Sequence, residues 1–242
     1  MRARVGYGGG AIGDYPWNLD GMRPWSSEDS SSAIELIKSL PRLGVDFIDT
    51  ANRYGFGESE RVIGRAVEGM NFHFDIVTKI ELSSYSKMIE DYNISRRRLG
   101  KIDGLLFHNP DLSNTLLLNQ GCGWLKSLKN LKWRGFSTEP TPDAKVYYDS
   151  YGLNAIEFPY SFYDRRAESD IFPWATGIFK IANRCLGGPN QEGKTEESLK
   201  KSLDFIMTRI DTVDVFLIGT TKKNNLIQCL NHLEVLSESR RV

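Results

Sequence analysis

The chain alternates short apolar runs with longer segments in which apolar residues recur every three or four positions. The short runs have the length and composition of buried strands, and they occupy residues 3–9, 46–51, 74–80, 103–108, 134–137, 154–159, 177–182 and 214–219. Strands that alternate with helical segments in this way are typical of a parallel sheet with crossover connections. The pattern therefore predicts an α/β fold.

Apolar stripes at helical spacing lie between these runs and predict helices. The stripes occupy residues 33–40, 62–67, 85–92, 125–131, 199–210 and 226–233. Pro41 and Gly44 indicate the end of the first helix, and Gly69 the end of the second. Two connections are weaker, since residues 141–152 are short for a barrel helix and residues 161–176 show little periodicity.

Eight strand–helix units in 242 residues match the size of a (β/α)₈ TIM barrel. We therefore expect one barrel domain spanning residues 1–242, with its active site at the C-terminal ends of the strands. A doubly wound open sheet is the alternative, and "GYGGGAIG" at residues 6–13 offers glycines where such a fold binds phosphate. No capped helix follows it directly, and no acidic residue closes a second strand in the dinucleotide-binding pattern, so the barrel is favoured.

Composition narrows the function. The 31 basic and 31 acidic residues balance, which gives no indication of nucleic acid or an anionic membrane as a partner. No apolar run reaches the ~18 residues of a membrane span, and the first residues lack the apolar core of a signal peptide. Three cysteines without CxxC spacing and three histidines without an HExxH pattern argue against disulfides and a metal. We expect a reduced cytoplasmic protein and leave its oligomeric state open.

Polar residues stand at the ends of three successive predicted strands. Asp49, Lys79 and His108 end the second, third and fourth strands, and Tyr54 follows the second strand on a glycine-rich loop. An ordinary ion pair or a structural hydrogen bond would explain any one of them alone. Because the C-terminal strand ends of a barrel carry its active site, the coincidence of all four predicts that they meet there.

These four side chains make chemical sense together as a proton donor. A phenol has a pKa near ~10, and a nearby ammonium group is expected to lower it. A buried lysine keeps its charge only beside a carboxylate, which gives Asp49 a reason to lie next to Lys79. A histidine within reach can orient a substrate oxygen or relay a proton. Such a group suits protonation of a carbonyl oxygen.

Several segments resemble the aldo-keto reductases. They are "GVDFIDTANRYGFGESERVIGRAV" at 44–67, "IVTKI" at 76–80, "SRRRLGKIDGLLFHNPD" at 95–111 and "FLIGTTKKNNLIQCL" at 216–230. The resemblance implies a barrel that reduces an aldehyde or ketone with NADP(H), with Tyr54 as general acid, Asp49 and Lys79 tuning it, and His108 orienting the carbonyl. The chain ends soon after its last predicted helix, so the resemblance also implies a short member without the family's C-terminal loop.

The resemblance also implies cofactor-binding positions. Ser137, Thr138 and Glu157 stand where the family holds the nicotinamide carboxamide with serine, asparagine and glutamine, so the last two are departures. The residues implied for the adenosine phosphate and adenine are Gly219, Thr220, Thr221, Lys222, Asn225 and Gln228. A 2′-phosphate site at Thr220, Thr221 and Lys222, beside the N-terminus of the last helix, would suit NADPH.

We expect an open pocket rimmed by aromatic side chains, in which Trp17, Phe56 and Tyr85 contact the substrate. The expected substrate is a small-molecule carbonyl compound of the bulky, polar kind, such as a sugar. Two other functions stay open. One is a cofactor-binding barrel with a sensory or subunit role and little turnover. The other is a cofactor-free lyase or isomerase that uses the same tyrosine and lysine.

Overall fold

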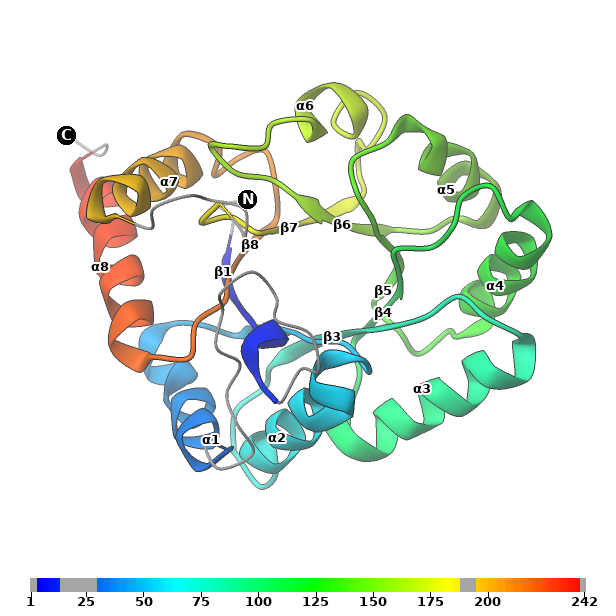
Figure 1. Ribbon diagram of the computed structural model, residues 1–242, viewed down its shortest axis with the longest axis horizontal. Helices are drawn as coiled ribbons and strands as arrows, with labels where there is room; N and C mark the ends of the chain where they lie inside the picture. Colours follow the sequence, from blue (N-terminus) through cyan, green and yellow to red (C-terminus); the bar gives the residue numbers. More distant parts are fainter. Residues whose placement is uncertain (1–3, 14–29, 188–194, 240–242) are drawn as a thin grey trace.

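Eight parallel strands close into a barrel in the order in which they occur in the sequence (Figure 1). The computed structural model describes residues 4–13, 30–187 and 195–239, so Trp17 lies outside the described residues. The strands are β1 Arg4–Gly8, β2 Phe47–Asp49, β3 Asp75–Ile80, β4 Gly104–His108, β5 Trp133–Ser137, β6 Ala155–Pro159, β7 Phe179–Asn183 and β8 Val215–Ile218. Pairing of β1 with β8 closes the barrel, which confirms the predicted (β/α)₈ fold.

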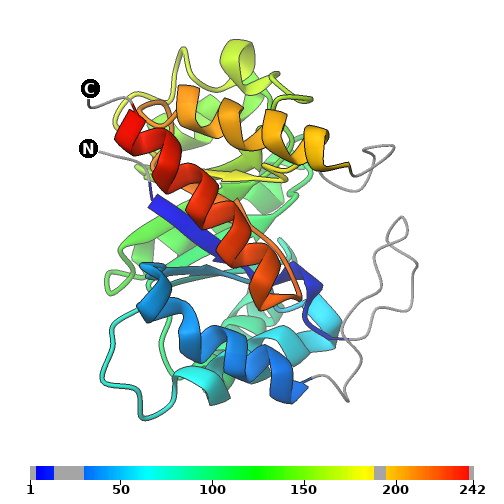
Figure 2. The same ribbon diagram turned by 90° about the vertical axis from the view of Figure 1, so that its left-hand side faces the viewer.

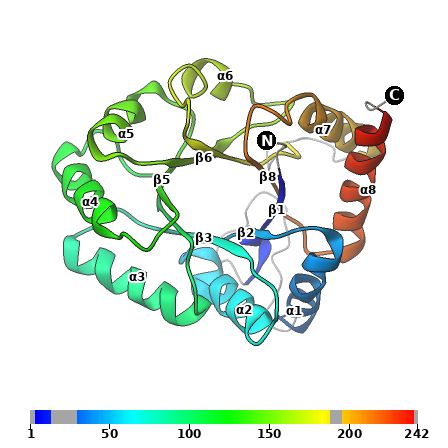
Figure 3. The same ribbon diagram turned by 180° about the vertical axis from the view of Figure 1, so that it is seen from behind.

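Helices surround the barrel on all sides, and Figure 3 shows the same ring from the opposite end. They are α1 Ser30–Ser39, α2 Glu58–Val67, α3 Tyr85–Leu99, α4 Thr115–Ser127, α5 Lys145–Tyr151, α6 Ala167–Asp170, α7 Glu196–Thr208 and α8 Lys223–Ser239. Every predicted strand is confirmed, and the predicted helical stripes fall largely on helices. Helix α4 ends at Ser127, so Leu128 and Leu131 of the 125–131 stripe lie in the turn before β5. The two weak connections contain the short helices α5 and α6. No helix in the described part of the chain is long and apolar enough to cross a membrane.

Helix α8 crosses the outside of the barrel between α7 and α1, so the last helix lies beside the first (Figure 2). Its Leu226 and Leu233 belong to the large core that lies between the strands and the helices. This packing places the β8–α8 turn at the same end of the barrel as the other strand-to-helix connections. The barrel is thereby closed both by strand pairing and by helix packing.

The inside of the barrel is filled by a separate apolar cluster. Its buried members are Phe47, Val77, Leu106, Trp133, Ala155, Ile181, Val215 and Leu217. The rings of Trp133 and Phe179 stack with their centroids 4.5 Å apart near the N-terminal ends of the strands. Since side chains along a strand alternate between its two faces, the residue two positions after each of these apolar residues also points inward.

Helices α2 and α3 approach each other closely at Gly64. A Cβ atom added at Gly64 would lie 1.8 Å from the carbonyl oxygen of Arg98, so no larger residue fits without moving a helix. Gly123 on α4 offers a contrast, because a Cβ atom there would meet nothing within 4 Å. The α2–α3 contact matters for the site because α2 directly follows the loop that carries Tyr54.

We expect Gly64→Ala to lower the free energy of unfolding by about 2 kcal/mol, because the added methyl group overlaps the α3 backbone. Gly123→Ala is the matched control and should raise it by about 0.5–1 kcal/mol, since alanine is the better helix former. Urea unfolding of both variants measures the difference. Equal effects of the two substitutions would contradict the close contact.

Candidate active site

Polar side chains cover the inner apolar cluster at the C-terminal ends of six neighbouring strands. This inner polar layer consists of Asp49, Lys79, His108, Ser137, Glu157 and Asn183, each on the inward face of its strand. Asp49, Lys79, His108, Glu157 and Asn183 each follow an inner-cluster residue by two positions, namely Phe47, Val77, Leu106, Ala155 and Ile181. Strand alternation therefore explains why polar groups from distant parts of the sequence meet.

The ammonium group of Lys79 is the centre of this layer. Lys79 is fully buried and pairs with Asp49 Oδ1, with Glu157 Oε2 at 3.0 Å, and with the carbonyl oxygen of Thr50 at 3.0 Å. Burial alone would lower the pKa of Lys79, but the charges of Asp49 and Glu157 raise it above its usual value. The predicted contact of Lys79 with Asp49 is present, and the lysine stays charged.

Glu157 takes part in the layer in a way the sequence did not suggest. Its Oε2 faces Lys79, and its Oε1 accepts a hydrogen bond from Asn183 Nδ2 at 2.7 Å. Asn183, the last residue of β7, was missed as a partner of Glu157. The signal that identified Asp49 and His108, a polar residue at a strand end, applies equally to Asn183.

Tyr54 lies at the edge of the layer on a tight turn, Tyr54–Gly57. Its ring centroid is 5.5 Å from Lys79 Nζ and 5.8 Å from the ring centroid of His108, with the two rings perpendicular. The turn packs against the segment after β1, where a Cβ atom at Gly55 would lie 2.6 Å from Gly13 Cα. The structure therefore brings together Asp49, Tyr54, Lys79 and His108.

The expected lowering of the Tyr54 pKa is not what the structure gives. Burial raises the pKa of Tyr54 to about 12, and the charges of Asp49 and Glu157 act in the same direction. Lys79 does lower it, as predicted, but desolvation of the phenolate is the larger effect. The phenol is consequently held in its protonated form throughout the neutral range.

His108 is the last residue of β4 and is held uncharged. Burial, followed by the repulsion of Lys79, lowers its pKa to about 4. Its Nδ1 atom is buried without a hydrogen-bond partner among the described residues. The same holds for Asn52 Oδ1, Ser83 Oγ and Asn183 Oδ1, which also follow or end barrel strands. Buried polar atoms normally find partners, so these four atoms at the C-terminal end of the barrel have hydrogen-bonding capacity left for a polar ligand.

The motif Gly57-Glu58-Ser59-Glu60 fixes the strands from their outer face. Ser59 Oγ donates to the carbonyl oxygen of Gly9 at 2.9 Å and lies 2.8 Å from Thr50 Oγ1. Thr78 Oγ1 donates to Glu60 Oε1 at 2.7 Å, and Glu60 Oε2 pairs with Arg98 at 3.0 Å. Thr50 and Thr78 are the sequence neighbours of Asp49 and Lys79, so this network positions the backbone of both.

The residues implied for the cofactor lie at the same end of the barrel. Ser137 and Thr138 are buried at the end of β5, where the Thr138 amide donates to the Glu157 carbonyl oxygen at 2.9 Å. Gly219 and Thr221 follow β8, and Thr220 Oγ1 accepts a hydrogen bond from the Lys222 amide at 3.1 Å. Lys222, Asn225 and Gln228 are exposed at and just after the start of α8.

Two of the predicted substrate residues are exposed near this end. Phe56 lies within the Tyr54–Gly57 turn with 64% of its surface exposed, and its φ of 53° lies in the left-handed region. That conformation is costly for an aromatic residue. Tyr85 begins α3 and is 55% exposed. Both therefore present aromatic surface to solvent at the end of the barrel where Tyr54 lies.

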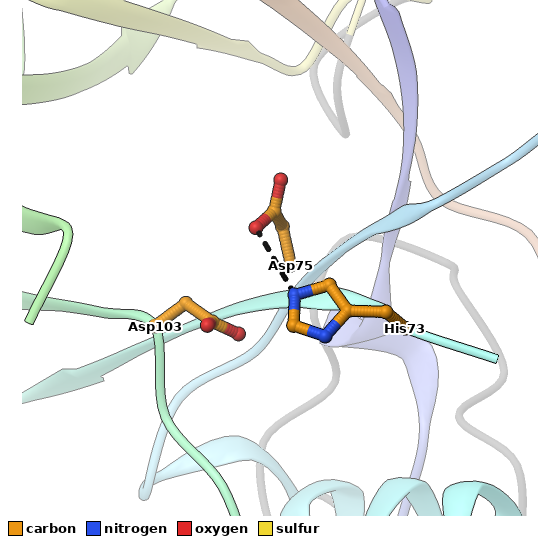
Figure 4. Close-up of side chains that lie close together, drawn as sticks. All are labelled: His73, Asp75 and Asp103. Carbon is orange, nitrogen blue, oxygen red and sulfur yellow. Dashed lines mark ion pairs between the residues drawn. The ribbon is translucent and has the colours of Figure 1, made fainter. Parts of the chain in front are cut away.

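A second polar cluster, His73, Asp75 and Asp103, lies at the opposite end of the barrel, where β3 and β4 begin (Figure 4). Lysine and arginine side chains already neutralise it. Lys101 Nζ lies 3.0 Å from Asp103 Oδ1 and 2.8 Å from His73 Nε2, and Asp75 pairs with Arg4 and Lys132. This cluster reads as a structural charge network, which the N-terminal face of a barrel commonly carries.

Two hollows of about 380 and 390 Å³ also lie away from the inner polar layer. The first is lined by Arg61, Arg65, Ile94, Arg97 and Arg98 between α2 and α3, and the second by Trp133, Asn154, Gly177, Ile178, Phe179, Lys180 and Asp214 near the N-terminal strand ends. Neither contains a predicted site residue.

A parallel barrel whose mouth holds a tyrosine, a lysine, an aspartate and a histidine defines a class of protein. Residues 4–178 match the sequence profile of the Aldo/keto reductase family, and the chain belongs to this family.

Individual relatives are distant. Aldo-keto reductase YhdN of Bacillus subtilis is 26% identical over 190 residues, covering 72% of this chain and 56% of the relative. The NADH-specific methylglyoxal reductase of Escherichia coli is 27% identical over 203 residues, covering 71% and 59%. The chain thus spans less than two thirds of either relative. An aldo-keto reductase from Klebsiella pneumoniae in complex with NADPH has a TM-score of 0.71 and 18% identity, covering 97% of this chain and 90% of that one.

The state of His108 predicts a pH dependence of stability. The unfolded chain protonates this histidine near pH 6.5 and the folded chain only near about 4, so the unfolded state binds more protons between these values. The free energy of unfolding should therefore fall by up to about 3 kcal/mol as pH drops through this window. Urea unfolding at several pH values should show a smaller fall for His108→Asn. Parallel pH profiles of the two proteins would contradict a neutral, buried His108.

Proposed function

We propose that the protein reduces an aldehyde or ketone to an alcohol with NADPH, and that Tyr54 donates the proton. The observation that carries the proposal is the convergence of Tyr54 and His108 on the fully buried ammonium group of Lys79. Family membership supports the same class of reaction. The carboxyl groups of Asp49 and Glu157 lie against Lys79 and keep it charged.

Residues of the inner polar layer fit the polar end of a nicotinamide cofactor. Asn183 Oδ1 is a buried acceptor without a hydrogen-bond donor among the described residues. Ser137, Thr138 and Glu157 lie beside it at the ends of the preceding strands. At the β8–α8 turn, Thr220, Thr221 and Lys222 offer hydroxyl and ammonium donors for a phosphate. A bound NADPH supplies the hydride for the carbonyl carbon.

In the proposed reaction, the side chains of the protein supply and control the proton. Tyr54 stays protonated at neutral pH, so it is a donor rather than a base before the reaction. As the carbonyl oxygen gains negative charge it becomes basic enough to take the phenolic proton, and Lys79 stabilises the phenolate that remains. Neutral His108 forms a hydrogen bond that orients the carbonyl oxygen of the substrate.

The exposed aromatic residues support a substrate with both a polar and an apolar side. Phe56 is held in a costly left-handed conformation in the same turn as Tyr54, and strain of this kind is concentrated at functional sites. Phe56 and Tyr85 are accordingly proposed to contact the substrate, and Trp17 remains a proposal from sequence. A small carbonyl compound, sugar-like in its polarity, matches this surface.

Tyr54→Phe should lower turnover of a reducible aldehyde about a hundredfold to ten-thousandfold, which is the range of general acid catalysis. The aromatic ring remains, so the affinity for NADPH, measured by quenching of tryptophan fluorescence, should hardly change. Tyr151→Phe is the control, because that hydroxyl donates to Asn119 Oδ1 on the outside of the barrel, away from the inner polar layer. Unchanged turnover in Tyr54→Phe would favour a cofactor-binding subunit or a different acid.

Lys222→Ala should weaken NADPH binding about tenfold and leave NADH binding almost unchanged, since only NADPH carries the 2′-phosphate. Lys129→Ala is the control, as Lys129 is an exposed lysine between α4 and β5 at the other end of the barrel. Fluorescence titrations with both cofactors measure the ratio. An equal loss for NADH and NADPH would contradict a phosphate contact at Lys222.

A further inference from the structure

Two carboxyl groups, rather than one, surround the buried ammonium group. Lys79 is fully buried, Glu157 is 1% exposed and Asp49 is 3% exposed. Both carboxyl groups approach the same Nζ atom, from β2 on one side and from β6 on the other. With both ionised, the three groups would carry a net negative charge without access to water, which is strongly unfavourable.

Among the described residues, few other charges lie in the same region to offset that excess. The described titratable and charged groups that act on the layer are Tyr54 and Arg53 from the β2–α2 connection, His108 from β4, and Arg184 and Cys185 after β7. Of these, His108 is neutral, and Tyr54 and Cys185 are held protonated by burial. Arg53 and Arg184 direct their guanidinium groups to Glu81 and Glu139.

We propose that Asp49 and Glu157 share one proton and hold a single negative charge beside Lys79, so that Glu157 is a second counter-ion and a positioning residue of the site. This proposal rests on the assignment of Lys79 and Tyr54 to carbonyl reduction. Its consequence is redundancy. Removal of either carboxyl leaves the other ionised next to Lys79, and the charge around Tyr54 stays the same.

Hydrogen bonding places the proton on Asp49. Glu157 receives an additional N–H from Asn183, which stabilises its ionised form. Burial would raise the pKa of Glu157, yet Lys79 and Asn183 hold it below its usual value. Burial and the neighbouring charge of Glu157 raise the pKa of Asp49 well above its usual range. Two carboxyl groups in contact behave in this way, because both cannot ionise together.

The test is a double-mutant cycle with Asp49→Asn, Glu157→Gln and the double variant. We expect each single variant to lower kcat/KM for aldehyde reduction by much less than the double variant does, because one carboxyl group remains beside Lys79. The double variant should fall about tenfold to a hundredfold below the product of the two single effects. The pair Asp49→Asn and Glu90→Gln is the control, because Glu90 is an exposed partner of Lys87 on α3 and its effect should be simply additive.

Two readouts do not depend on turnover. The urea midpoint of the double variant should drop by more than the sum of the single shifts, because Lys79 is then buried without a counter-ion. In an ultraviolet titration against a Tyr54→Phe blank, ionisation of Tyr54 should move little in either single variant. An additive cycle in both kcat/KM and urea midpoint, or an Asp49→Asn effect as large as that of the double variant, would overturn the proposal. Loss of the proposed reductase activity with the stability coupling intact would contradict only the assigned function.

Discussion

The rest of this site depends on one buried positive charge, the ammonium group of Lys79. Lys79 lies inside the barrel with no access to solvent, and such an ammonium group keeps its proton only when negative charge lies against it. Asp49 and Glu157 provide that charge from two strands, and the backbone carbonyl of Thr50 provides a further acceptor. The chemistry proposed for Tyr54 depends on Lys79 remaining charged, so it depends on these partners.

The barrel makes this arrangement possible because its interior is divided into layers. Apolar residues such as Phe47, Val77 and Ala155 fill the middle, and the next inward position on each of these three strands carries a polar residue. The apolar layer excludes water from below, which strengthens each charge interaction above it. The outer face of the same strands is fixed by Ser59 and Glu60, so one short motif supports the backbone whose inward side chains form the inner polar layer.

Burial shifts the pKa values of two titratable groups near Lys79 in opposite directions. It raises the pKa of Tyr54 to about 12 and lowers that of His108 to about 4, so that both are neutral at physiological pH. A neutral phenol beside an ammonium group can donate its proton. A neutral imidazole can form hydrogen bonds and carries no charge that would repel Lys79. The local electrostatics thus keep both groups in the neutral forms that the proposed reduction uses.

The sequence by itself determined the eight strands, the barrel and the convergence of Asp49, Tyr54, Lys79 and His108, because strand length, helical periodicity and strand-end polarity are local properties. Only the tertiary structure decided that Glu157 faces Lys79, that Asn183 supports Glu157, and that the pKa of Tyr54 rises rather than falls. Those outcomes depend on which side chains meet across the barrel and on how completely water is excluded. Neither quantity can be read along the chain, since both arise when strands distant in sequence close on one another.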